Sequence, residues 1–142
     1  MAIHALTIIL SLILAVGAAD QGTPSQERAA LDGTWLVTSL FLNGVYRGDA
    51  AEVAIMITGN AYEQDVNGQV NERGTLRVDP SKKPMTIDFI ITEGSAQNTT
   101  QLGIVEVSGD TLKLHLNQPG ANGRPADFNP LDDHMLIIAR KK

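Results

Sequence analysis

Apolar and polar side chains alternate along most of the chain, and this alternation predicts β-strands. Ile87, Phe89 and Ile91, for example, are separated by single residues, and a period of two places such a set on one face of a strand. Eight segments carry the pattern: Trp35–Leu42, Val53–Thr58, Ala61–Val66, Gln69–Val78, Met85–Ile91, Leu102–Val107, Thr111–Leu116 and His134–Arg140. Eight antiparallel strands in sequence predict an all-β, up-and-down barrel without exposed edges, although a two-sheet sandwich also fits the pattern.

Tight turns between the segments predict how the strands pair. Gly109-Asp110 is typical of a two-residue hairpin, and it pairs Val107 with Leu112. Gly59-Asn60 pairs its neighbouring strands in the same way. Both hairpins then have one mostly apolar face, as the wall of a barrel requires.

The turn Asn67-Gly68 gives a pairing that conflicts with the pattern further along the strand. It is a strong hairpin signal, but its register leaves Leu76 and Val78 in the wrong phase. One extra residue would restore the phase, and glycine tolerates the geometry of a bulge. We therefore expect a β-bulge near Gly74.

A short helix is predicted ahead of the barrel. Thr23 is a suitable N-cap, Pro24 suits the first helical position, and Gln26 lies where the partner of a capping box belongs. The helix should end at Leu31 or Asp32, before the first strand.

The first nineteen residues have the features of a signal peptide. The segment Ala5–Val16 is mostly apolar and is followed by small residues. It is short for a bilayer span, which needs about 20 apolar residues, so cleavage after Ala18 or Ala19 is expected. The prediction is an exported protein, periplasmic, in the cell envelope or extracellular, with a signal peptide at 1–19, a linker and helix at 20–31, and a barrel domain at 32–142.

Composition limits the classes of partner. The chain has 142 residues, enough for one domain, and 43% of them are hydrophobic. Its net charge of −5 argues against electrostatic binding to nucleic acid. It contains no cysteine, so disulfides, zinc-thiolate sites and thiol nucleophiles are excluded.

Several segments carry a resemblance to known families. Gly33-Thr34-Trp35 resembles the opening motif of lipocalins. A wider set is similar to a family of bacterial domains found mainly in planctomycetes: 31–35, Asp79–Pro84 with Thr86–Asp88, 102–104 with 109–114, and Arg124-Pro125 with Phe128. This resemblance implies a lipocalin-like fold and no particular activity.

The lipocalin resemblance also implies a way of closing one end of the barrel. In that arrangement Trp35, at the start of the first strand, packs under an arginine of the last strand. Arg140 is the matching residue, and the contact of its guanidinium with the ring would be worth about 0.5–2 kcal/mol. Alternatively, Trp35 is an ordinary core residue and Arg140 is solvated.

The candidate ligand-binding residues fall into two groups. Tyr62, Phe89 and Leu114 are expected to point into the barrel, where they either contact a small ligand or fill the space. Arg124 and Phe128 belong to the long connection 117–133, which is either a lid or partner surface, or an irregular loop pinned by Phe128.

Catalytic and metal-binding patterns are not found. His115 and His134 lie on neighbouring predicted strands, but His115 falls on the outward face and metal sites usually need three or more ligands. No nucleophile elbow or phosphate-binding glycine loop occurs. We expect no enzyme, no cofactor and no metal.

Two functions remain open on this sequence. The first is a carrier or sensor that binds a small apolar ligand inside the barrel. The second is a protein-interaction or inhibitory module of the cell envelope that uses the loop 117–133 and outward apolar residues such as Leu36, Leu40 and Leu42. Exposed apolar surface would favour the second.

Overall fold

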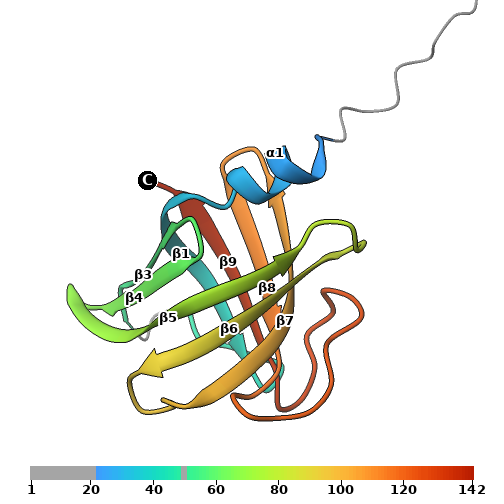
Figure 1. The fold of residues 1–142 in the computed structure, drawn as a ribbon. Coiled ribbons are helices and arrows are strands. Elements are labelled where there is room, and N and C mark those ends of the chain that lie inside the picture. Colours follow the sequence, from blue (N-terminus) through green and yellow to red (C-terminus); the bar gives the residue numbers. More distant parts are fainter. Residues whose placement is uncertain (1–21, 49–50) are drawn as a thin grey trace, which may run out of the picture.

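A computed structural model describes residues 22–48 and 51–142, and the predicted signal peptide lies outside them. Eight antiparallel strands form a closed barrel (Figure 1). A short ninth strand, β2, pairs with the last residues of β1. The elements are α1 (Pro24–Ala29), β1 (Gly33–Leu42), β2 (Val45–Tyr46), β3 (Val53–Thr58), β4 (Ala61–Val66), β5 (Gln69–Asp79), β6 (Met85–Glu93), β7 (Thr99–Ser108), β8 (Thr111–Leu116) and β9 (Met135–Lys141).

The barrel closes because β1 pairs with both β3 and β9. Every other strand pairs with its neighbour in the chain, which is the predicted meander, and the sandwich alternative is wrong. All eight predicted strands are present with shifts of at most a few residues at their ends. Only β2 was not predicted, because two residues are too few to show an alternation.

Both glycine hairpins have the predicted register. Val107 pairs with Leu112 across Gly109-Asp110, and Ile57 pairs with Tyr62 across the other turn. Gly109 and Gly59 have positive φ angles of 57° and 58°, which glycine adopts without the steric cost that a Cβ would add. Local turn chemistry therefore sets the pairing of these strands.

The register between β4 and β5 shifts by one residue, as predicted, but at a different place. The extra residue is Asn71, since Gln64 pairs with Glu72 while Asp65 pairs with Val70. Gly74 has another role: a Cβ there would lie 2.0 Å from the backbone oxygen of Ile90. Gly74 thus allows β6 to approach closely. The extra residue of β5 lies three residues before it, while the pairing of β5 with β6 also shifts register between Arg73 and Gly74.

A second bulge, at Thr38 in β1, was not predicted. Val37 pairs with Ala139 and Ser39 with Ile138, which leaves Thr38 unpaired. Beyond this bulge Leu40 packs against the core instead of facing outward. The expectation that Leu40 and Leu42 add to an outer apolar surface is therefore wrong, because one extra residue reverses the two faces of a strand.

Helix α1 lies across one end of the barrel (Figure 1). Its predicted capping box is present: the backbone nitrogen of Gln26 donates to Thr23 Oγ1 over 3.3 Å, and the backbone nitrogen of Thr23 donates to Gln26 Oε1 over 2.9 Å. The helix is shorter than predicted and ends at Ala29. Leu31, in the turn that follows, is fully buried.

Trp35 and Leu31 close this end of the barrel from inside. Trp35 is fully buried, and its indole nitrogen donates to the backbone oxygen of Leu31 over 2.8 Å. The cation over its ring is Lys141, whose Nζ lies 5.3 Å from the ring centre. Arg140 does not fill the role expected of it, because it pairs with Leu36 on the outward face and is exposed.

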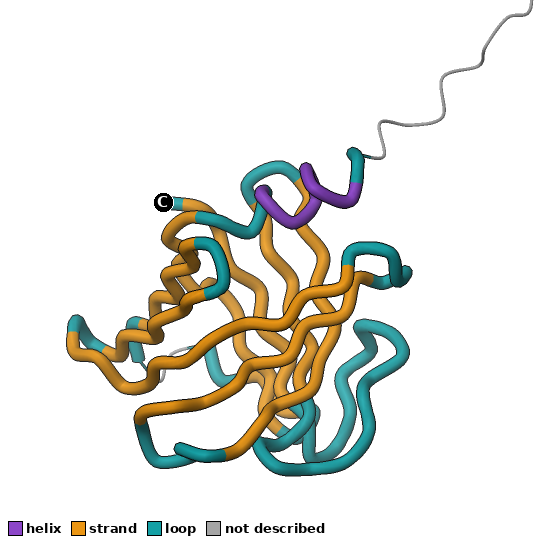
Figure 2. Tube along the Cα trace, viewed as in Figure 1, coloured by secondary structure: helices purple, strands orange, loops and turns teal. Residues whose placement is uncertain are grey.

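The loop 117–133 runs along the outside of the barrel beside β6 and β7 (Figure 2). Arg124 binds the backbone oxygens of Ile87 and Gly103, at 3.1 and 2.6 Å. Pro125 is buried, and Lys113 Nζ lies 5.2 Å from the centre of the Phe128 ring. The middle of the loop is therefore packed onto the barrel wall and does not cover the mouth.

Candidate functional site

A cavity of 180 Å³ lies inside the barrel, and its mouth is at the end where β8 runs into the loop 117–133, since Pro119 of that loop lines it. Its wall is mainly apolar, and polar side chains gather toward the mouth. The lining residues are Ile55, Tyr62, Gln64, Asn71, Glu72, Phe89, Gln101, Leu114, Leu116, Pro119, Met135 and Ile137. Pro119 belongs to the start of the loop 117–133, which is the part of the loop that reaches the mouth.

Three of the predicted ligand-binding residues meet in this cavity. Tyr62, Phe89 and Leu114 all line it and are at least 96% buried. The rings of Tyr62 and Phe89 meet edge to face, with centres 4.8 Å apart, a favoured geometry for aromatic pairs. The inward direction of Tyr62 and Leu114 follows from the hairpin registers, and that of Phe89 follows from the alternation along its strand. Arg124 and Phe128 lie on the outer wall and do not line this cavity.

A partly buried polar contact lies in the wall of the cavity. The Tyr62 hydroxyl donates to Glu72 Oε1 over 2.8 Å. Burial raises the pKa of the Tyr62 hydroxyl, and the nearby carboxylate raises it further. Burial also raises the pKa of Glu72, although the hydrogen bond from Tyr62 acts in the opposite direction. An apolar cavity with a few convergent, perturbed polar groups is the usual form of a small-molecule site.

Sequence reasoning missed Glu72 because of the position of the bulge. With an extra residue at Gly74, Glu72 would pair with Glu63 and face outward. The extra residue at Asn71 instead pairs Glu72 with Gln64, whose face points inward. Because the observed bulge lies three residues before the predicted one, the Glu72 carboxylate faces the cavity and not the surface.

Gln101 adds a second polar group. It is 6% exposed, and its amide nitrogen donates to the backbone oxygen of Asn117 over 2.8 Å. This bond holds the amide nitrogen on the backbone, so the amide oxygen is the group available to a ligand. A neighbouring pocket of 250 Å³ shares Gln101, Pro119 and Met135 with the cavity, and it widens the mouth toward solvent.

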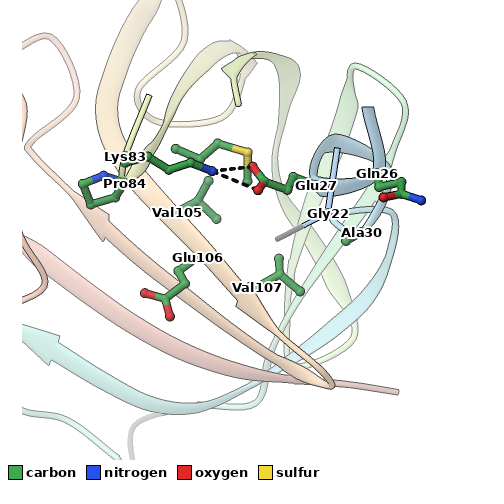
Figure 3. A pocket seen from close by; sticks show the side chains of 10 residues that line it. Gly22, Gln26, Glu27, Ala30, Lys83, Pro84, Val105, Glu106 and Val107 are labelled. Carbon is green, nitrogen blue, oxygen red and sulfur yellow. Dashed lines mark hydrogen bonds and ion pairs between the residues drawn. The ribbon is translucent and has the colours of Figure 1, made fainter. Parts of the chain in front are cut away.

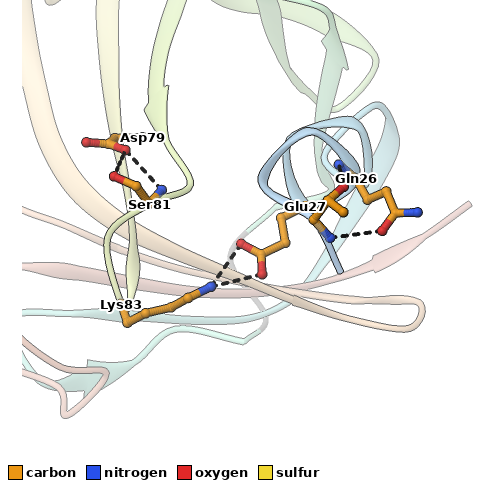
Figure 4. Close-up of polar contacts among 6 residues, drawn as sticks. Gln26, Glu27, Asp79, Ser81 and Lys83 are labelled. Atoms are coloured by element: carbon orange, nitrogen blue, oxygen red, sulfur yellow. Dashed lines mark hydrogen bonds and ion pairs between the residues drawn. The ribbon is translucent and has the colours of Figure 1, made fainter. Parts of the chain in front are cut away.

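A second hollow, of 390 Å³, lies between α1 and the barrel (Figure 3). Met85, Val105 and Val107 form its floor, and Lys83 lies across it toward the helix. Lys83 Nζ is 2.9 and 3.1 Å from the two carboxylate oxygens of Glu27 (Figure 4). The charges of Lys83 and Glu27 in this crevice thus neutralise each other, and their ion pair attaches α1 to the loop after β5.

The loop after β5 is held by the last residue of that strand. Asp79 accepts hydrogen bonds from the backbone nitrogen and the hydroxyl of Ser81, at 3.0 and 2.6 Å (Figure 4). These bonds lower the pKa of Asp79. The most specific segment of the planctomycete resemblance, Asp79–Pro84, therefore makes structural contacts here.

His115 points outward from the barrel, as its register predicts, yet it is fully buried. The loop 117–133 covers it, and His115 Nδ1 lies 2.5 Å from the backbone oxygen of Asp127. The His134 ring lies 5.3 Å away, centre to centre. Within the described residues no group of three or more His, Cys, Asp or Glu side chains is placed to hold a metal ion.

Comparison with known proteins gives no relative: no protein-family model, curated protein or solved structure matches this chain. Over 22–48 and 51–142, no helix is long and apolar enough to cross a membrane. The antiparallel barrel is therefore established by the structure alone. The planctomycete resemblance stays a prediction.

Proposed function

We propose that this protein binds a small organic molecule, about the size of one aromatic ring, inside its barrel. The observation that carries the proposal is the 180 Å³ cavity, in which two aromatic rings meet a half-buried carboxyl group. A dry cavity of about 150 Å³ is sufficient to bind benzene in a protein. The lipocalin-like architecture supports a carrier or sensor role of this kind.

The setting of the proposed function is outside the cytoplasm. Its support is the apolar segment Ala5–Val16 followed by small residues, which is typical of an export signal. The role is binding without catalysis, since the sequence carries no recognised catalytic motif. A carrier or sensor of the cell envelope or the periplasm would meet small ligands that enter from the medium.

The alternative, a protein-interaction module built on the loop 117–133, has weaker support. Arg124, Pro125 and Phe128 make their contacts with the barrel itself. Exposed large apolar side chains are few in the described residues and are Val45, Tyr46, Val70 and Leu131. Scattered single side chains of this kind are normal on a soluble protein and do not indicate an interface.

Ligand binding can be tested with benzyl alcohol, followed by calorimetry and by NMR of isotope-labelled protein. We expect a dissociation constant of about 1 mM or tighter, which corresponds to about −4 kcal/mol. The NMR shifts should change at Tyr62, Phe89 and Leu114. Shifts confined to the outer wall, or no binding, would contradict the proposal.

A variant that fills the cavity supplies the matched control. Leu116→Phe adds a ring at a lining position that is 4% exposed, and it should abolish binding while the barrel remains folded. Leu36→Phe makes the same chemical change on the outward face of β1, opposite Arg140. It should leave binding unchanged. Equal binding by both variants would place the ligand outside the barrel.

A further inference from the structure

Two polar side chains of the cavity, Glu72 and Gln101, each offer a free acceptor of hydrogen bonds, whereas the amides of Gln64 and Asn71 can donate or accept. Tyr62 occupies Glu72 Oε1, so the second carboxylate oxygen is free to accept. Gln101 commits its amide nitrogen to the backbone of Asn117, which leaves its oxygen as a further acceptor. Both side chains line the cavity near its mouth. A ligand that fits this arrangement must bring donors of its own.

The cavity also carries a negative charge without a positive partner. None of the described residues that line it is Lys, Arg or His. Arg73, which follows Glu72 in the chain, is directed elsewhere, with its guanidinium 2.6 Å from Glu63 and 3.2 Å from Glu93. A partly buried carboxylate that has a hydrogen bond but no cation beside it is destabilised in its charged form. A ligand cation would supply the missing counter-charge.

From these contacts we infer that the ligand is a small primary amine that carries an aromatic or apolar group. Its ammonium group binds the free oxygen of Glu72 and the amide oxygen of Gln101. Its apolar part packs on Phe89, Leu114 and Ile137, deeper in the barrel. The rings of Tyr62 and Phe89 add to the preference, because an aromatic face attracts a cation.

The inference rests on the proposed function and names the ligand class of the same site. The preference for an amine distinguishes this cavity from a purely apolar one. A purely apolar cavity would bind neutral and charged aromatic ligands with affinities that follow their hydrophobicity alone. The inference also predicts a repulsion: a carboxylate ligand of the same size meets the charge of Glu72, and in the part of the chain that the structure describes no Lys, Arg or His lines the cavity to offset it.

The test compares three probes of one shape, benzylamine, benzyl alcohol and benzoate, by calorimetry at pH 7. Benzylamine should bind about tenfold more tightly than benzyl alcohol, the gain expected from one hydrogen bond between charged groups. Benzoate should bind weakest. Equal binding of benzylamine and benzyl alcohol would overturn the inference and leave the proposed function intact, whereas no binding of any probe would overturn both.

The variant Glu72→Gln keeps the size of the side chain and a hydrogen bond to Tyr62, and it removes the charge. It should retain benzyl alcohol binding and lose the preference for benzylamine. Glu93→Gln makes the same change at a carboxylate that is 62% exposed on the outside, and it should keep the preference. A preference that survives in Glu72→Gln would assign the charge recognition to another group and refute the inference.

A pH titration of the unmodified protein gives an independent readout. Alkylamines titrate at about pH 10, so benzylamine remains a cation throughout the acid range. The preference over benzyl alcohol should therefore fall as Glu72 takes up its proton, and the midpoint should lie above the usual carboxyl range because burial raises the pKa of Glu72. A preference independent of pH down to pH 3 would contradict the role of Glu72.

Discussion

Arg124 is the residue that fixes the loop 117–133 to the barrel, and its removal should weaken the fold measurably. Its Nη2 lies 2.7 Å from Asp88 Oδ1, and its Nη1 donates to the backbone oxygens of Gly103 and Ile87. The Asp88 side chain is only 10% exposed. The variant Arg124→Ala removes the cation and leaves these three acceptors facing a gap.

The expected loss can be bounded from the geometry. Breaking one side of a fully buried ion pair costs about 3–5 kcal/mol. Here the value is smaller, because Arg124 is 29% exposed and water can reach the gap, and because Arg77 remains 3.5 Å from the other oxygen of Asp88. We therefore expect Arg124→Ala to lower the free energy of unfolding by about 2–3 kcal/mol.

Arg77 provides the matched control, since it pairs with the same carboxylate but is 72% exposed. Arg77→Ala should cost less than about 1 kcal/mol, as surface ion pairs do. Urea unfolding followed by circular dichroism measures both variants, and hydrogen exchange should show the loop amides of Arg124→Ala opening first. If the two variants lose equal stability, the reasoning about the buried contact is wrong.

Three further outcomes follow from single contacts. Glu72→Gln should stabilise the unliganded protein above the raised pKa of Glu72, because the folded state then no longer carries a half-buried charge. The gain should vanish as pH falls below the unfolded pKa of about 4.5. Unfolding curves at pH 7 and pH 3 measure this gain, and an equal gain at both would contradict the reasoning. Lys141→Ala should cost about 0.5–1 kcal/mol, through loss of the contact with Trp35, whereas Arg140→Ala should change stability by less than about 0.5 kcal/mol; the reverse order in thermal unfolding would restore Arg140 as the closing residue. Gly74→Ala should cost more than about 2 kcal/mol, since its Cβ would lie 2.0 Å from a backbone oxygen of β6; a variant as stable as the parent in urea would refute this close approach.

Strand positions and most pairings were predictable because they depend on neighbouring residues. Alternation over six residues defines a buried face, and a two-residue turn with glycine at a positive φ sets which residues face each other, as at Gly59 and Gly109. Two cavity residues, Tyr62 and Leu114, followed from those registers, and a third, Phe89, followed from the alternation of its own strand. The sequence by itself therefore determined the strands, most of their pairings and the apolar part of the candidate site, whereas the pairing of β1 with β9, which closes the barrel, was decided by the tertiary structure.

The tertiary structure decided the polar part of the site. The pattern required one extra residue in β5, but only packing against β4 and β6 decided that it is Asn71, and this turned Glu72 inward. The bulge at Thr38 turned Leu40 toward the core for the same reason. A bulge costs about the same at several neighbouring positions of an isolated strand, so the fit of the closed barrel selects among them.

For the loop 117–133, too, the sequence determined one part of the description and the tertiary structure the other. Its length and its glycines and prolines follow from the sequence, but alternation gave no information on where an irregular segment lies. Contacts between distant residues, such as Arg124 with Asp88, place it on the outer wall and bury His115 beneath it. Local patterns thus determined the strands of this protein, whereas the bulges and the loop were decided by long-range contacts that exist only after the barrel has closed.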